Sequence, residues 1–233
     1  MNINYLSENI IIENNHSYFI DNKTKIKINK YNWHKYFDSL GWFKFDISII
    51  KQINKLSKNP CKNNLFGLLD CGGGGDCLFN CISHAYNSSN VYDIVTSMDL
   101  RNKIAESINE RNFEDIIEHY KIMHTSNEFS EDWDPYNINL RVFKNKIKDS
   151  SFWSDYILIN KLINILNINL IILTEHNNRL QLYNTLHKYN ENIPSIIIYY
   201  IDHHFLLVGY FNDTIVSLFN DSNLPYEIKQ LFK

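Results

Sequence analysis

The sequence predicts an α+β fold in which helices pack around a small central β-sheet. Helical periodicity dominates residues 77–166, and strand patterns gather over residues 169–211. A turn-rich segment around Pro60 separates these blocks from an N-terminal part. We therefore expect an extension at residues 1–60 that packs on the core, and a main domain at residues 61–233.

The N-terminal part combines short strands with one helix. Apolar residues fall on one stripe of residues 47–56, which predicts a helix. Short apolar segments predict strands at residues 10–13, 17–20 and 25–28. Several aromatic side chains, which a disordered tail would lack, indicate that the extension is folded: Trp33, Tyr36, Phe37, Trp42 and Phe43.

The main domain begins with helices and ends with strands. Helices are predicted from residue 77 onward, over 97–108 with Ser97 as the N-cap, over 113–122 and over 154–166. A polar stretch between the third and fourth helices predicts a surface loop. Strands are predicted at residues 169–175, 180–186, 195–201 and 205–211.

Composition narrows the class of protein. The 233 residues are 44% hydrophobic and 21% charged, with a net charge of −3, which is ordinary for a soluble globular protein. Lysines are scattered and do not form a basic block, so neither nucleic acid nor an anionic membrane is an expected partner. The first residues lack the pattern of a signal peptide, and no apolar run approaches the roughly 20 residues of a membrane span.

The four cysteines are spaced poorly for a disulfide framework, and a reducing compartment is expected. A zinc site is the alternative, built from Cys61, Cys71, Cys77, Cys81 and His84. Structural zinc prefers two pairs of ligands, each two to four residues apart. The cysteines are separated by nine, five and three residues, so we expect neither a metal nor another cofactor.

Four consecutive glycines, Gly72 to Gly75, account for more than half of the 7 glycines in the chain. Such a loop can curl and aim several backbone N–H groups at one point, either at a phosphate or at the oxyanion of a tetrahedral intermediate. A phosphate loop would continue with Lys and Ser or Thr, whereas Asp76 and Cys77 follow here. This excludes the phosphate loop and favours an oxyanion hole.

Cys77 stands where the glycine loop meets the predicted helix. A helix N-terminus favours negative charge, and the thiolate is the reactive form of cysteine. A cysteine near a helix start is more often a small buried residue, but the glycine loop in front of Cys77 favours a nucleophile. A cysteine hydrolase also needs a histidine, which is usually distant in sequence.

Four segments together resemble the ovarian tumour (OTU) family of cysteine proteases. CLFNCIS at 77–83, behind its glycine loop, resembles the family's nucleophile motif. MDLRNKIAESI resembles the following helix, and WSDYILINKLINILNINLIIL at 153–173 resembles a later helix and strand. IIIYYIDHHFLLVGYF at 196–211 resembles the closing strand pair. The resemblance covers residues 65–212 and implies the papain-related OTU fold.

The resemblance assigns two catalytic residues. Cys77 matches the nucleophile, and His204 matches the general base because Phe205 follows it. Cys81 matches a position that usually holds Ala, so we expect a small core residue there. Strand alternation places His203 on the opposite face of the sheet from His204.

The loop departs from the family pattern at two positions. Asp76 replaces the usual Asn before the nucleophile, and Gly74 replaces an Asp two residues earlier. A carboxylate at Asp76 would disfavour the adjacent thiolate, but it could instead cap the helix, and the cap is favoured. Gly73, Gly74, Gly75 and Asp76 are the residues expected in the oxyanion loop.

The third member of the triad is also altered. Many relatives place Asp or Asn two residues after the His, where this chain has Leu206. Asp202 is the first choice for a substitute, because it would share a strand face with His204. Asp70 and Asn212 are the weaker options.

The resemblance implies a thiol protease that cleaves the isopeptide bond at the C-terminus of ubiquitin. Its partners would be ubiquitin, polyubiquitin chains or ubiquitin-like modifiers, and we expect a monomer. The alternative is a weak or inactive OTU-like module that binds ubiquitin. Trp153 could wall a narrow groove for the ubiquitin tail, although a core position is favoured. The extension at 1–60 is expected to help bind the substrate or to stabilise the core.

The skew toward Asn, Ile, Lys and Tyr is typical of an A+T-rich genome. A large DNA virus, an intracellular bacterium or a protozoan parasite would each fit. The expected location is therefore the cytoplasm, including the cytosol of a host cell, or a virion.

Overall fold

The computed structural model describes residues 3–22, 24–56, 64–89, 94–129, 133–177, 179–183 and 188–232. Their strands are β1 (Ile3–Tyr5), β2 (Ile10–Glu13), β3 (His16–Asp21), β4 (Thr24–Lys27), β5 (Trp42–Lys44), β6 (Phe66–Leu69), β7 (Asn169–His176), β8 (Arg179–Leu182), β9 (Ser195–Ile201), β10 (His204–Asn212), β11 (Thr214–Val216) and β12 (Leu218–Phe219). Their helices are α1 (Trp33–Phe37), α2 (Ile47–Leu56), α3 (Cys77–Ser89), α4 (Ser97–Ser107), α5 (Glu110–Thr125), α6 (Leu140–Lys148), α7 (Tyr156–Leu166) and α8 (Tyr226–Lys229), with two short 3₁₀ helices, η1 (Asp38–Leu40) and η2 (Gln230–Phe232).

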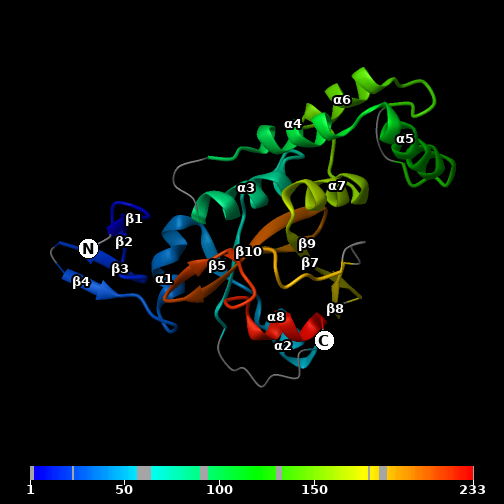
Figure 1. The fold of residues 1–233 in the computed structure, drawn as a ribbon. Coiled ribbons are helices and arrows are strands. Elements are labelled where there is room, and N and C mark those ends of the chain that lie inside the picture. The colour runs from blue at the N-terminus through cyan, green and yellow to red at the C-terminus, as the bar shows by residue number, and fades with distance from the viewer. Residues whose placement is uncertain are drawn as a thin grey trace.

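The strands form two sheets (Figure 1). Strands β1 to β4 make an antiparallel sheet in sequence order. The larger sheet has eight strands in the order β5-β6-β10-β9-β7-β8, with β11 on β10 and β12 on β9. Only the β7–β9 pair is parallel among the described strands of this sheet. The α+β prediction is confirmed.

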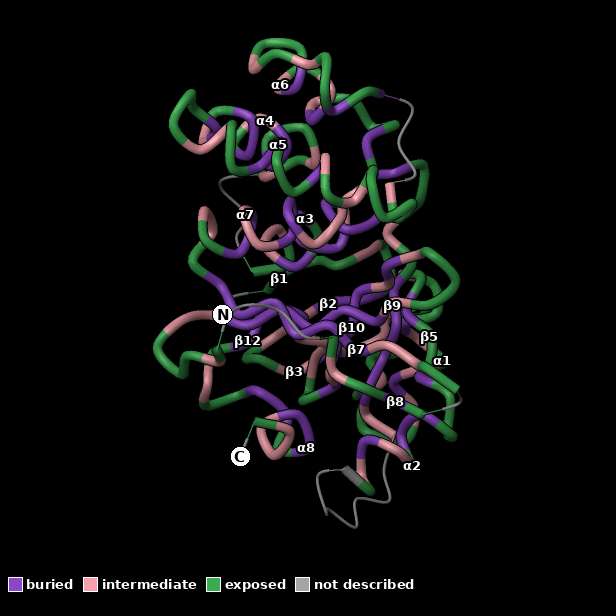
Figure 2. Tube along the Cα trace, turned by 90° about the vertical axis from the view of Figure 1, so that its right-hand side faces the viewer, coloured by how far each residue is buried: buried purple, intermediate pink, exposed green. Residues whose placement is uncertain are grey.

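Helices cover both faces of the larger sheet (Figures 1 and 2). Helices α3 to α7 lie on one side, and α2 and α8 lie on the other. Along β10, Phe205 and Leu207 face the α3 side, whereas Leu206 and Val208 face the α2 side. Because both faces are buried, the central strands are apolar on both sides, as is typical of a sheet between two helical layers. In the part of the chain that the structure describes, no helix has the length and apolar character to cross a membrane.

Most predicted elements are present, and two of the differences concern helices α4 and α6. Helix α4 begins at the expected Ser97, but its N-cap is Thr96, whose hydroxyl accepts the Asp99 N–H while the Asp99 carboxylate accepts the Thr96 N–H. This reciprocal capping box satisfies two backbone donors, which explains why the cap falls one residue earlier. Helix α6 was not assigned from the sequence, and it begins at Leu140 behind an Asn139 cap.

The N-terminal part supplies an element of the main sheet. Strand β5 pairs antiparallel with β6, with Trp42 opposite Leu69. Trp33, Phe37 and Trp42 are buried in the α3-side core, and Phe45 with the apolar stripe of α2 is buried in the α2-side core. The expected domain boundary around residue 60 lies outside the described residues.

We predict that a fragment of residues 61–233 does not fold on its own. It lacks β5 and the buried apolar side chains of residues 28–56, which are Ile28, Trp33, Phe37, Trp42, Phe45, Ile49, Ile50 and Ile53. Each such burial stabilises the fold by about 1.5–3 kcal/mol, against a total stability of about 5–15 kcal/mol. Thermal unfolding followed by circular dichroism should show no cooperative transition.

The matched control is a fragment of residues 28–233, which loses only the β1–β4 sheet and keeps β5 and α2. We expect this fragment to unfold cooperatively at a lower temperature than the whole chain. Cooperative melting of the 61–233 fragment near the temperature of the whole chain would contradict the prediction.

Candidate active site

Cys77 is the first residue of α3, directly after the glycine loop. The helix begins there because the Asp76 carbonyl accepts the Asn80 N–H at 2.8 Å, which is the first hydrogen bond of the helical ladder. The Cys77 residue is 5% exposed and borders a cleft. The unpaired N–H groups of the first helical turn favour negative charge at this position, which suits a thiolate.

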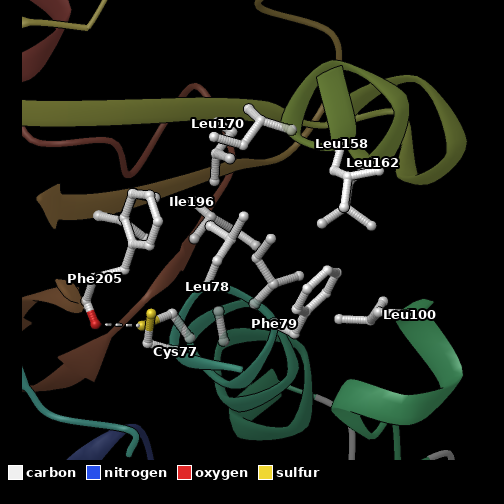
Figure 3. Close-up of a cluster of buried hydrophobic side chains, with 14 of the residues drawn as sticks. Cys77, Leu78, Phe79, Leu100, Leu158, Leu162, Leu170, Ile196 and Phe205 are labelled. Atoms are coloured by element: carbon white, nitrogen blue, oxygen red, sulfur yellow. Dashed lines mark hydrogen bonds between the residues drawn. The ribbon is translucent and has the colours of Figure 1, made fainter. Parts of the chain in front are cut away.

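Helix α3 is fixed by its buried face. Leu78 points from α3 toward Ile196 of β9, and Phe79 points toward Leu162 of α7 (Figure 3). On the sheet side, the Cys81 thiol contacts the Phe205 carbonyl oxygen, with 3.5 Å between sulfur and oxygen. The helix is therefore held between a helical layer and β10, which limits the movement of Cys77.

The glycine loop needs glycine at defined positions. Gly72, Gly74 and Gly75 have φ angles of +95°, +75° and +91°, in the left-handed region that other L-residues rarely adopt. A Cβ at Gly75 would also overlap the backbone carbonyl oxygen of Ser150. The loop thus curls tightly around the start of α3, in the manner expected of an oxyanion loop.

His204 is the first residue of β10, and its ring is held by Asp70. The Nε2 atom of His204 lies 3.0 Å from the Asp70 Oδ1 atom, and the ring lies beside Gly73. The same Oδ1 atom accepts the Gly72 N–H at 2.9 Å. The bond from Gly72, followed by the one from His204, lowers the pKa of Asp70, so its carboxylate is ionised at neutral pH.

The structure corrects the position expected for Asp202. Ile201 of β9 pairs with His204 of β10, so Asp202 and His203 form the two-residue turn between them. Their φ angles of +47° and +62° fit the left-handed conformation that such hairpin turns require. Strand alternation does not extend through a turn, so the inference that Asp202 shares a strand face with His204 is wrong.

Of the two weaker options for the acid, Asp70 lies next to His204 and Asn212 lies far from it. Asp70 follows β6 and bonds to His204 directly. Asn212 is the last residue of β10, eight residues beyond His204. A strand of that length spans about 26 Å, so Asn212 lies at the far end of the strand.

His203 lies in a different place from the one expected. Instead of pointing to the opposite sheet face, it lines the cleft together with Cys77. Its Nδ1 atom is 3.4 Å from the Tyr200 hydroxyl. The turn brings both His203 and His204 to the site. Of these two, only His204 forms a hydrogen bond with a carboxylate among the described residues.

The cleft beside Cys77 has a volume of about 230 Å³ and aromatic walls. The aromatic side chains that line it are Trp153, Tyr156, Tyr183, Tyr200 and Phe205. Trp153 is 52% exposed, so the expected core position is wrong and its side chain forms part of the cleft wall. Gly75 borders the same cleft and lies against the Trp153 ring.

Asp155 is a cleft residue that the sequence analysis did not identify. Its carboxylate caps α7 by accepting the N–H groups of Ile157 and Leu158, at 2.9 and 3.0 Å. Burial raises its pKa, and these hydrogen bonds oppose the rise. The signal was present as an Asp before an apolar helical pattern, which is typical of an N-cap.

Two further thiols, those of Cys71 and Cys81, lie near Cys77. A hydrogen bond with Cys71, followed by burial, raises the pKa of Cys81 well above its usual value, so Cys81 stays a neutral thiol. Its full burial agrees with the small core residue expected there. Within the described ranges, no three potential metal ligands gather, and Cys61 lies outside those ranges.

Asp76 makes a contact that the sequence did not reveal. Its Oδ1 atom accepts a hydrogen bond from the Nε atom of Arg101 on α4, at 2.6 Å. The favoured cap by the Asp76 side chain is therefore wrong, because the carboxylate forms an ion pair with Arg101. The Asp76 backbone carbonyl only accepts the first hydrogen bond of the helical ladder. The guanidinium balances the negative charge that stands beside Cys77.

A cysteine at a helix start, a curled glycine loop before it and a histidine bonded to a carboxylate are the parts of a thiol hydrolase site. The family model for OTU-like cysteine proteases matches residues 72–211, which is more than half of the chain. The chain belongs to the OTU-like cysteine protease family.

Solved OTU domains are similar at low identity. The OTU domain of OTUD1 is 15% identical, with a TM-score of 0.41, over 78% of this chain and 93% of that one. An OTU deubiquitinase from Wolbachia pipientis wMel is 17% identical, with a TM-score of 0.41, over 74% and 98%. Its structure bound to ubiquitin is 14% identical, with a TM-score of 0.42, over 68% and 98%. Comparison with curated proteins gave no match.

We predict that Gly75→Ala and Gly74→Ala differ sharply in stability. Both positions have positive φ, but a Cβ at Gly75 overlaps the Ser150 carbonyl, whereas a Cβ at Gly74 has no neighbour within 4 Å. Backbone strain alone costs about 1–2 kcal/mol, and the overlap should bring the loss at Gly75 to about 3 kcal/mol or more. Urea unfolding measures both values, and equal losses would contradict the geometry of the loop.

Proposed function

We propose that this protein is a deubiquitinase that hydrolyses the isopeptide bond between the C-terminus of ubiquitin and a lysine. The observation that carries the proposal is the combination of Cys77 at the start of α3 with a His204 ring that bonds to Asp70. Membership of the OTU-like cysteine proteases supports the reaction class.

The residues have separate roles in the proposed reaction. His204 takes the proton of the Cys77 thiol, and the thiolate attacks the carbonyl carbon of the isopeptide bond. Backbone N–H groups between Gly73 and Cys77 hold the oxyanion of the tetrahedral intermediate. His204 then protonates the departing lysine amine, and water hydrolyses the thioester to release ubiquitin.

Asp70 fixes the tautomer of His204 in this scheme. When the Nε2–H group donates to the Asp70 carboxylate, the Nδ1 atom keeps a lone pair and can accept the thiol proton. The carboxylate also stabilises the imidazolium that forms after the transfer. Asp70 therefore takes the role first assigned to Asp202.

The shape of the cleft supports a glycine-terminated substrate. At about 230 Å³, with Trp153, Tyr183 and Tyr200 among its walls, it is small for a peptide with bulky side chains. The terminal diglycine of ubiquitin carries no side chain and needs only a narrow channel. Ubiquitin-like modifiers with the same ending share this property, so they belong to the proposed substrate class.

The remaining parts of the proposal concern the state of the protein. We propose that it acts as a monomer, without a cofactor, in a reducing compartment of the cytoplasm where Cys77 stays a thiol. A ubiquitin-binding module without activity is the competing function. Turnover of a ubiquitin C-terminal amide distinguishes the two.

We predict that Cys77→Ala abolishes cleavage of ubiquitin chains and leaves ubiquitin binding intact, because the substitution removes only the nucleophile. A ubiquitin probe with a C-terminal electrophile should label the wild-type protein at Cys77, as located by peptide mass spectrometry. Cys71→Ser and Cys81→Ala serve as controls and should still be labelled. Labelling at Cys71 or Cys81 would refute the assignment of the nucleophile.

We predict that His204→Ala abolishes turnover and that Asp70→Asn lowers kcat by about 10²- to 10⁴-fold, the loss typical of a removed triad acid. Asp202→Asn is the matched control, since Asn tolerates the positive φ of the turn and the change likewise removes one carboxylate. Its kcat should stay within about threefold of the wild type. Steady-state hydrolysis of a ubiquitin C-terminal amide gives all three values.

His203→Asn tests the competing histidine without straining the turn. If His203→Asn has no turnover while His204→Ala is active, the general base is His203 and not His204. If Asp202→Asn loses turnover while Asp70→Asn is active, Asp202 is the acid of the triad.

A further inference from the structure

Arg101 is a charged side chain in the interior of the protein. It projects from α4 with 1% of its side chain exposed. Burial of an ion costs several kcal/mol, and an apolar residue of similar volume often serves stability equally well. Packing alone therefore does not explain an arginine at this position, and its hydrogen bonds indicate another role.

Two of these bonds reach the glycine loop. The Nε atom donates to the Asp76 carboxylate at 2.6 Å, and the Nη2 atom donates to the Gly75 carbonyl oxygen at 3.0 Å. Gly75 and Asp76 are the two residues directly before Cys77. One guanidinium thus binds the end of the loop through both the Asp76 side chain and the Gly75 backbone.

The other contacts hold the guanidinium itself. Its Nη1 atom donates to the carbonyl oxygens of Ile147 and Phe152, at 2.8 and 3.1 Å. Its plane lies over the Phe79 ring, with 4.3 Å between the Arg101 Cζ atom and the ring centroid. Helix α4, the end of α6 and the nucleophile helix therefore form a frame around the charge.

We propose that Arg101 is a positioning residue that orients the oxyanion loop. The peptide bond between Gly75 and Asp76 is planar, so its N–H group points away from its carbonyl oxygen. Because Arg101 holds the Gly75 carbonyl oxygen, it sets the direction of the Asp76 N–H on the other side of the chain. The inference rests on the proposed function, in which N–H groups of this loop hold the oxyanion.

The geometry requires arginine rather than any cation. The Nε and Nη2 atoms engage the loop while Nη1 engages the helical layer, which takes a rigid planar fork with donors on several edges. The ammonium of lysine is a single point charge, so it cannot reach the Asp76 carboxylate, the Gly75 carbonyl and the Ile147 carbonyl together. Arg101→Lys therefore keeps the buried charge and loses the orientation.

The test compares Arg101→Lys with Arg141→Lys, an exposed arginine on the neighbouring helix α6. With a fluorogenic amide of the ubiquitin C-terminus, Arg101→Lys should lower kcat by about 10- to 100-fold while KM changes less than about threefold, as misplaced transition-state contacts do. Arg141→Lys should match the wild type in both constants.

A second measurement separates orientation from general damage. Iodoacetamide alkylates the Cys77 thiolate without forming an oxyanion, so its rate at Cys77 should stay within about threefold in Arg101→Lys. A third pair, Asp76→Ala and Asp76→Asn, tests the other end of the contact. Asp76→Ala removes the acceptor and should lower kcat by about tenfold, whereas Asp76→Asn keeps an oxygen acceptor and should lose less kcat than Asp76→Ala.

The outcomes distinguish this inference from the proposed function. A wild-type protein without turnover refutes the proposed function, and the role of Arg101 falls with it. An active wild type with normal kcat in Arg101→Lys overturns the role of Arg101 alone. Equal losses of kcat and of the alkylation rate in Arg101→Lys also overturn it, as does an Asp76→Ala protein that is as active as Asp76→Asn. If Arg101→Lys does not fold, the comparison of the two Asp76 variants decides the question.

Discussion

The pairing register between β6 and β10 determines the candidate site. Leu69 lies opposite Leu207, so Asp70 leaves the sheet where β10 begins with His204. A slip by one residue would turn the α3-side residues of β10 toward α2. Since both faces of these strands are buried, such a slip would disrupt two cores. The apolar packing of the sheet therefore holds the histidine and its carboxylate together.

The glycine loop links this part of the sheet to Cys77. It spans the short distance from Asp70 to Cys77, and its positive φ angles let the chain turn back into α3. Glycine makes the turn possible but leaves it free to move, since the residue has the largest conformational freedom. Two contacts restrict the loop at the end next to Cys77. The Ser150 carbonyl packs against Gly75, and Arg101 donates a hydrogen bond to the Gly75 carbonyl oxygen. The carboxylate at Asp76 becomes compatible with a thiolate neighbour because a guanidinium balances its charge.

The N-terminal part is linked to the site through the sheet. The family model begins at residue 72, yet β6 precedes that point and β5 pairs with β6. Trp42 packs under Gly209 of β10, where a Cβ would lie 2.6 Å from the ring. Residues 28–56 thus support the strand that carries His204. Their contribution to stability reaches the site through β6 and β10 rather than through contact with the cleft.

The sequence alone determined what local patterns can encode. The period of apolar residues predicted the helices α2, α3, α4, α5 and α7 and the strands β7, β8, β9 and β10 of the main sheet. The glycine loop with its adjacent cysteine indicated the nucleophile. The resemblance to OTU proteases added His204. Tertiary structure decided the partners of these residues, because they are remote in sequence: Asp70 and His204 are 134 residues apart, and Asp76 and Arg101 are 25 apart. The inference that Asp202 shares a strand face with His204 failed, because Asp202 and His203 are left-handed residues of a turn where alternation assumed a strand. Trp153 is exposed although tryptophan is usually buried. Local periodicity fixes which face of an element is apolar, whereas register, turns and packing between layers fix which polar groups meet.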